Sequence, residues 1–176
     1  MDQRPLVLVG LMGVGKTTVG RLVAERAGRP FVDTDEAICA RTGRTVRELW
    51  EAGGEAAYRK LESQVVLDSL GGGDHRIVVG AAAGVILDPA VRDALGKPDV
   101  LVVWLHADPA VLAGRVHPGD HRPLLKDRPR DVLAEMDAER ASLYRSVADA
   151  VVETGGRDPA AIASQVIQLI GERDSG

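Results

Sequence analysis

The sequence predicts an α/β fold, a three-layer sandwich in which a mainly parallel five-stranded sheet lies between two layers of helices. Short aliphatic and β-branched runs alternate along the chain with helical patterns, which is typical of parallel strands joined by helices. The first run, residues 5–10, is apolar throughout, as expected for a strand buried on both faces. The 176 residues, 45% of them hydrophobic, suffice for one domain over residues 1–176, and no linker or repeat divides them.

Strands and helices are expected in regular alternation. The predicted strands are the runs at residues 5–10, 31–33, 76–80, 100–105 and 150–153. The predicted helices cover residues 16–27, 35–43, 55–70, 88–95, 109–115 and 131–146, and a last helix begins at Pro159. Together these elements account for most of the chain, as a single compact domain requires.

Several segments between these elements carry recognisable signals. Thr45 and Glu48 fit a capping box, in which each side chain bonds to the other residue's backbone N–H. The glycine run at residues 71–73 is expected to end the helix over residues 55–70. Residues 116–130 are polar, rich in proline and charge, and without periodicity, so we expect them to form a mobile lid.

The composition excludes several classes of partner. A net charge of −4 gives no bulk attraction to nucleic acid or to an anionic membrane, and an aromatic content of 3% argues against a base-stacking surface. Cys39 is the single cysteine, so no internal disulfide is possible. No apolar run approaches the roughly 18 residues of a membrane span, and residues 1–10 do not resemble a signal peptide. We expect a cytoplasmic monomer that binds small molecules.

A phosphate-binding loop follows the first predicted strand. Residues 10–17, GLMGVGKT, match the pattern G-x-x-x-x-G-K-[ST] in full and lie between a strand and a helix, as that loop requires. The glycines let backbone N–H groups turn toward phosphate oxygens, Lys16 brings charge, and Thr17 offers a hydroxyl to Mg²⁺. The expected nucleotide-binding residues are Gly13, Val14, Gly15, Lys16, Thr17 and Thr18. The loop alone does not separate a kinase from a GTPase or an ATPase module, although no N-K-x-D motif for guanine is present.

Two carboxylates follow the second predicted strand. Asp33 ends this strand and Asp35 comes two residues later. The carboxyl ends of parallel strands border the ligand crevice, so these side chains are placed to serve a metal ion and a substrate hydroxyl. The structural alternative is that Asp35 is the N-cap of the helix over residues 35–43.

Further motifs give the chain a family resemblance. They are DTD at residues 33–35, GEAAYRKLE at 54–62, RPLL at 122–125, ERASLYR at 139–145 and GRDP at 156–159. With the phosphate loop, in this order and over nearly the whole length, they resemble the shikimate kinases, small phosphate-loop kinases of the nucleoside-monophosphate kinase superfamily. The resemblance implies a phosphate-loop kinase fold and ATP-dependent phosphorylation of shikimate to shikimate 3-phosphate.

The resemblance also implies roles for individual residues on the nucleotide side. Lys16 and Thr17 would hold the ATP phosphates and Mg²⁺, and Asp33 would help to hold the metal through water. Arg115 and Arg157 would border the adenine. Arg122 would reach from the lid to the phosphoryl group in transfer.

On the acceptor side, Asp35 would bind the substrate hydroxyls and orient or deprotonate the attacking one. Arg59 and Arg140 would clamp the substrate carboxylate, a task suited to the planar guanidinium group. Lys16, Asp35 and Arg122 are therefore the expected catalytic residues.

The chain departs from the family at a glycine signature that normally follows the third strand. Counted back from Asp88, the signature falls on residues 82–85, AAGV, so Ala82 and Ala83 stand where glycines are expected, beside Gly84. Alanine at positive φ would be strained by about 1 kcal/mol per residue, and two methyl groups would narrow the acceptor pocket. Two alternatives to shikimate kinase activity follow: a related kinase for another small hydroxy acid or hydroxy amino acid, or a catalytically weak nucleotide-binding regulator.

Overall fold

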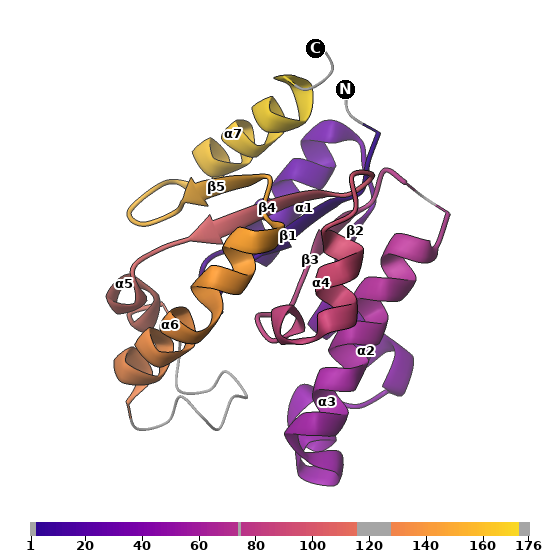
Figure 1. Ribbon diagram of the computed structural model, residues 1–176, viewed down its shortest axis with the longest axis vertical. Coiled ribbons are helices and arrows are strands. Elements are labelled where there is room, and N and C mark those ends of the chain that lie inside the picture. Colours follow the sequence, from indigo (N-terminus) through magenta and orange to yellow (C-terminus); the bar gives the residue numbers. More distant parts are fainter. Residues whose placement is uncertain (1–2, 74, 116–127, 173–176) are drawn as a thin grey trace.

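The computed structural model, which describes residues 3–73, 75–115 and 128–172, contains one five-stranded parallel sheet (Figure 1). The order β2-β3-β1-β4-β5 places the first strand at the centre. The strands are β1 (Leu6–Val9), β2 (Phe31–Asp33), β3 (Val78–Gly80), β4 (Leu101–His106) and β5 (Ala150–Glu153). All four strand pairs are parallel, which confirms the predicted sheet.

The core forms around β1 because this strand has neighbours on both sides and helices on both faces. Its four residues are at most 1% exposed. Leu8 pairs with Gly80 of β3 and with Val103 of β4, while Asp33 of β2 is opposite Gly80. This register brings the carboxyl ends of the central strands to one edge of the sheet, where a parallel α/β sheet offers its ligand crevice.

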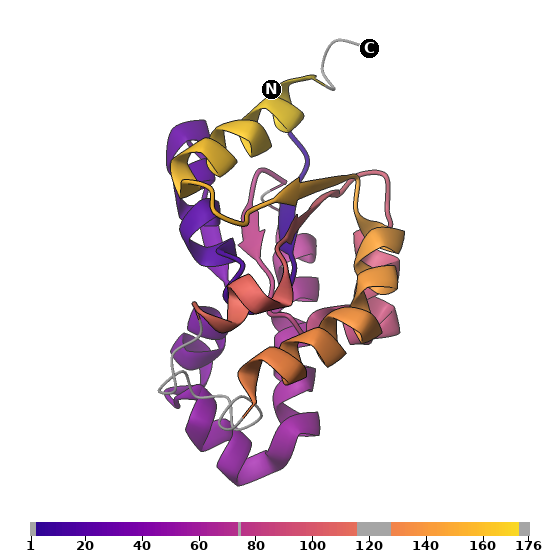
Figure 2. The same ribbon diagram turned by 90° about the vertical axis from the view of Figure 1, so that its left-hand side faces the viewer.

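Helices cover both faces of the sheet. They are α1 (Lys16–Ala27), α2 (Thr34–Thr42), α3 (Val46–Gly71), α4 (Pro89–Leu95), α5 (Pro109–Ala113), α6 (Pro129–Val147) and α7 (Pro159–Glu172), with a 3-10 turn η1 (Val85–Leu87). Helices α1 and α7 pack together on one face, and α4 and α6 lie on the other (Figure 2). The predicted three layers are therefore present.

Helix α3 is longer than the predicted helix over residues 55–70. It begins after Thr45, whose hydroxyl accepts from the Glu48 N–H at 3.2 Å while the Glu48 carboxylate accepts from the Thr45 N–H at 2.7 Å. The predicted capping box is thus confirmed. Gly54, at φ 72°, interrupts the helical geometry, so the kink at this residue separates the capped first part from the predicted second part.

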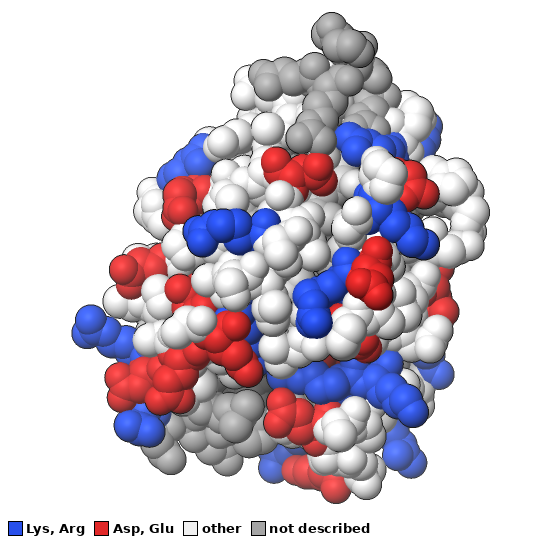
Figure 3. Space-filling view, viewed as in Figure 1, with Lys and Arg blue, Asp and Glu red and all other residues white. Residues whose placement is uncertain are grey.

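Two general features of the described residues are the distribution of surface charge and the character of the helices. Acidic and basic side chains lie interspersed on the face drawn in Figure 3. None of the described helices combines the length and the apolar composition that crossing a bilayer demands.

At the end of β1 the backbone of Gly10 passes close to the backbone of β4. Gly10 has φ 140°, and a Cβ there would lie 2.2 Å from the Leu105 backbone oxygen. We expect Gly10→Ala to lower the free energy of unfolding by about 3 kcal/mol, because the backbone must move and the φ is unfavourable for alanine. Chemical denaturation of wild type and variant measures this difference.

Gly171→Ala is the matched control for this substitution. Gly171 lies in α7, and a Cβ there would meet no atom within 4 Å. Because alanine favours helix by about 1 kcal/mol over glycine, this control should keep or raise stability. Equal losses in both variants would contradict the packing argument.

Candidate active site

The phosphate loop joins β1 to α1 and is shaped by glycines. Gly13 and Gly15 have φ values of 78° and 101°, in the left-handed region that favours glycine. Helix α1 starts directly at Lys16, so its N-terminal N–H groups face the interior of the loop. The loop therefore has the conformation that the sequence pattern predicts for a phosphate site.

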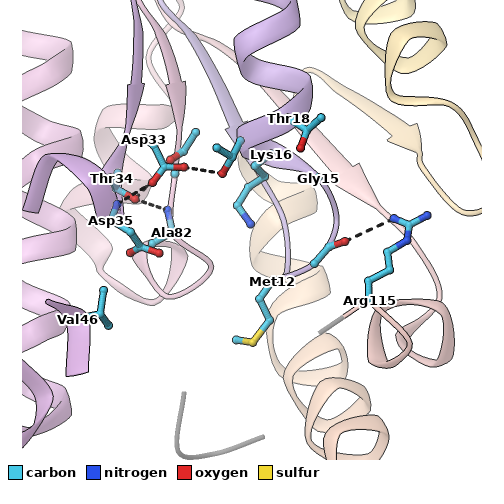
Figure 4. A pocket seen from close by; sticks show the side chains of 14 residues that line it. Met12, Gly15, Lys16, Thr18, Asp33, Thr34, Asp35, Val46, Ala82 and Arg115 are labelled. Carbon is cyan, nitrogen blue, oxygen red and sulfur yellow. Dashed lines mark hydrogen bonds between the residues drawn. The ribbon is translucent and has the colours of Figure 1, made fainter. Parts of the chain in front are cut away.

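Two cations border this loop. The Lys16 ammonium donates to the backbone oxygens of Gly10 at 2.8 Å and of Leu11 at 2.9 Å, which folds the side chain back over the loop. Arg115, at the end of the turn after α5, donates to the Gly13 oxygen at 3.5 Å and to the Thr154 oxygen at 3.1 Å (Figure 4). Positive charge is thus placed on two sides of the loop, as a polyphosphate requires.

Asp33 connects the loop with α2. Its Oδ2 accepts from the Thr17 hydroxyl at 2.6 Å, and its Oδ1 accepts from the backbone N–H groups of Asp35 and Glu36. Asp33 is therefore the N-cap of α2, and the alternative that gave this role to Asp35 is wrong. The helix begins at Thr34, one residue earlier than predicted, because the carboxylate of Asp33 satisfies its first N–H groups.

Most of the predicted nucleotide residues line one cavity of about 450 Å³. Its lining consists of Met12, Gly13, Gly15, Lys16, Thr17, Thr18, Asp33, Thr34, Asp35, Val46, Gly80, Ala81, Ala82 and Arg115. Both aspartates and the phosphate loop thus share one space (Figure 4).

Some predicted residues lie elsewhere. Val14 is 1% exposed and belongs to the main core, so its side chain does not reach the cavity. The Arg157 guanidinium donates to the Glu153 backbone oxygen at 2.8 Å and to Gln165 at 2.9 Å, outside the cavity lining. Arg122 and residues 116–127 of the predicted lid lie outside the described residues, and residues 129–130 already belong to α6.

The predicted acceptor residues surround the turn between β3 and η1. Ala83 offers its backbone oxygen to the Tyr144 hydroxyl at 2.8 Å and to the Arg140 guanidinium at 3.2 Å, both from α6. Gly84 lies against Arg59 of α3, since a Cβ at Gly84 would be 1.6 Å from the Arg59 Nη1. Two guanidinium groups from different helices therefore approach adjacent residues of one turn.

A half-buried guanidinium and a buried phenol belong to this arrangement. Burial opposes the charge of the Arg59 guanidinium, but its ion pairs with Glu62 at 2.9 Å and Glu55 at 3.1 Å outweigh this effect and raise the Arg59 pKa above its ordinary value. Burial likewise raises the pKa of Tyr144 well above its usual range, only partly offset by Arg140. Arg59 therefore stays positive and Tyr144 stays a proton donor at neutral pH.

The two alanines that replace glycines of the family signature, Ala82 and Ala83, are accommodated without backbone strain. Neither Ala82 nor Ala83 has a positive φ, so the strain expected from the sequence is absent. Gly84 has φ −85°, which other residues also adopt. Ala82 borders the cavity and belongs to the main core, whereas Ala83 is 2% exposed and is not part of the lining.

Comparison with known proteins identifies the family. The shikimate kinase family matches residues 12–171. The chain is 42% identical over 166 residues to the shikimate kinase of Halorhodospira halophila, a match that covers 94% of this chain and 92% of that one. It is 43% identical over 168 residues to the enzyme of Aromatoleum aromaticum, with coverage of 94% and 93%. The chain belongs to the shikimate kinase family.

Solved structures agree with this assignment. The structure of "Shikimate kinase from Acinetobacter baumannii in complex with shikimate" superposes with a TM-score of 0.91 at 33% identity, covering 98% of this chain and 96% of that one. A gluconokinase from Sinorhizobium meliloti, at 20% identity and a TM-score of 0.62, shares the fold alone. As a member of the shikimate kinase family, the protein is an ATP-dependent small-molecule kinase, which confirms the resemblance in the sequence.

Sequence reasoning missed residues of this site that act through contacts between helices. Thr34, 1% exposed, accepts a hydrogen bond from the Ala82 N–H at 2.8 Å, and the Tyr144 hydroxyl donates to the backbone oxygen of the next residue, Ala83. Tyr58 of α3 donates to Asp35 at 2.7 Å. Each of these residues lies within one of the motifs DTD, GEAAYRKLE and ERASLYR. Membership of a motif is therefore the signal in the sequence that could have identified them as site residues.

The contact between Gly84 and Arg59 yields a test of the acceptor side. Gly84→Ala should displace the Arg59 guanidinium and lower kcat/KM for the acceptor by at least about tenfold, because the carboxylate clamp predicted from the sequence would lose one of its two arms. The KM for ATP should stay within about twofold. Steady-state kinetics in both substrates measures the two effects.

The exposed change Gly171→Ala serves as control for general effects of alanine, and its kinetics should equal those of the wild type. If Gly84→Ala kept a normal KM and kcat for the acceptor, Arg59 would not depend on the space that this glycine provides.

Proposed function

We propose that the protein transfers the γ-phosphoryl group of ATP to a hydroxyl of shikimate, giving shikimate 3-phosphate. The main support is the approach of Arg59 and Arg140 to adjacent residues of one turn beside the cavity that contains Asp35 and the phosphate loop. Two guanidinium groups suit a carboxylate, because each can form charge-assisted and potentially bidentate hydrogen bonds. The shikimate complex of the Acinetobacter baumannii relative supports the same acceptor.

On the nucleotide side, the backbone of the phosphate loop and Lys16 would hold the phosphates, with Thr18 and Arg115 at the border of the cavity. Binding requires the Lys16 ammonium to exchange its two backbone oxygens for phosphate oxygens. A cation–carbonyl contact is thereby replaced by contact between opposite charges, which is the stronger interaction.

The pair of Thr17 and Asp33 fits Mg²⁺. Their oxygens lie 2.6 Å apart, and Mg²⁺ prefers few protein oxygens together with water and substrate phosphates. Thr17 would hold the ion directly and Asp33 through water. When bound, Mg²⁺ supplies neutralisation of the charge on the transferring phosphoryl group.

Asp35 would orient the acceptor hydroxyl and take its proton. It lies in the first turn of α2, in the cavity lining, on the same side as the phosphate loop. Arg122 is proposed to contact the phosphoryl group, as the family motif implies. We also propose that the protein acts as a monomer and that it works in the cytoplasm, where ATP is available.

The assay that tests this function is shikimate-dependent ADP release with Mg·ATP, compared with quinate, gluconate and hydroxy amino acids as acceptors. Lys16→Ala should lower kcat at least about a hundredfold with unchanged circular dichroism, because the phosphates lose their charged partner. Preferred use of another acceptor would support the related-kinase alternative, and no turnover with any acceptor would support the regulator. Wild-type turnover in Lys16→Ala would refute the phosphate-site assignment.

The alanines in place of the glycine signature give a second test of the proposed acceptor. Because Ala83 is enclosed and Ala82, although it borders the cavity, packs in the core, the double change Ala82→Gly with Ala83→Gly should alter kcat/KM for shikimate by less than about threefold. It should lower the melting temperature, since glycine loses more backbone freedom on folding. An improvement of tenfold or more in kcat/KM for shikimate would instead show that the methyl groups narrow the pocket.

A further inference from the structure

The expected proton acceptor of the reaction has a partner on a neighbouring helix. The Asp35 Oδ1 accepts a hydrogen bond from the Tyr58 hydroxyl at 2.7 Å. Asp35 comes from the first turn of α2, and Tyr58 comes from α3, four residues after the kink at Gly54. The bond therefore joins two helices at the margin of the cavity.

The Tyr58 ring is fixed by packing. Tyr58 is 3% exposed and forms a small core cluster with Ile38 and Val65, while Trp50 lies with its ring centroid 6.2 Å away. A phenylalanine ring would fill the same space, so packing alone does not account for the hydroxyl. A buried phenol oxygen requires a polar partner, and here that partner is a carboxylate.

We propose that Tyr58 is a positioning residue of the phosphoryl-transfer site, whose hydroxyl fixes the orientation of the Asp35 carboxylate toward the acceptor. The backbone N–H of Asp35 is already held by Asp33, so the hydrogen bond from Tyr58 constrains the side-chain torsions that remain. A charge-assisted O–H···O⁻ bond is strong enough to select one rotamer. This inference rests on the proposed function, because it assigns Asp35 to the acceptor hydroxyl.

The same helix also carries an arm of the carboxylate clamp. Arg59 follows Tyr58 directly and points to Glu62 and Gly84, whereas Tyr58 points to α2. Two adjacent residues of α3 thereby serve both proposed groups: Tyr58 orients the proton acceptor Asp35, and Arg59 contacts the substrate carboxylate.

Tyr58→Phe tests this role, since it removes one oxygen and keeps the ring. We expect kcat with shikimate to fall about tenfold, with the KM for ATP within twofold of wild type and the melting temperature nearly unchanged. Ser69→Ala is the matched control, because it also removes a side-chain hydroxyl from α3. The Ser69 hydroxyl donates to the Val65 backbone oxygen at 2.7 Å and does not contact Asp35. The control should keep wild-type kinetics.

A second measurement does not depend on the acceptor. In protein labelled with ¹³C at aspartate carboxyls, the Asp35 signal, assigned with Asp35→Asn, should shift in Tyr58→Phe and remain in place in Ser69→Ala. An unchanged signal, or wild-type kcat in Tyr58→Phe, would overturn the proposal. If the wild type does not phosphorylate shikimate, the proposed function fails, while the carboxyl signal still reports whether Tyr58 holds Asp35.

Discussion

The buried turn after β3 imposes the constraint on which the acceptor side depends. Its backbone leaves the sheet inside the protein, where N–H and C=O groups need partners other than water. The Ala82 N–H bonds to the Thr34 hydroxyl, and the Ala83 oxygen accepts from Tyr144 and Arg140. Helices α2 and α6 are thereby tied to two adjacent residues of the turn, α2 to Ala82 and α6 to Ala83. The position of Arg140, one of the proposed substrate-binding groups, follows from the need to satisfy this backbone.

The elements that the sequence predicts well are those whose causes are local. The phosphate loop is set by glycines within eight residues and by the strand and helix that flank it, and the structure has it as predicted. The capping box needs only Thr45 and Glu48, three residues apart. The parallel sheet follows from the alternation of strands with helices, because parallel neighbours require crossover connections.

The sequence alone does not predict contacts between residues that are far apart in the chain. From sequence, a glycine signature suggests positive φ, and the alanines therefore suggested strain. The structure gives a different reason for Gly84: its φ is ordinary, but the Arg59 guanidinium occupies the space of a Cβ. The pairing of Tyr58 with Asp35 likewise joins residues 23 apart on two helices, and Tyr58 lies after the kink at Gly54.

Asp33 shows how one side chain couples the two halves of the site. Its Oδ1 caps α2 and so fixes the backbone N–H of Asp35, while its Oδ2 is directed at the Thr17 hydroxyl of the phosphate loop. Because the two oxygens face different elements, cation binding beside Thr17 does not require α2 to lose its cap. The Asp33 carboxylate therefore links the phosphate loop to α2, which carries the proposed acceptor group Asp35, and such a link suits the transfer of a group between two bound substrates.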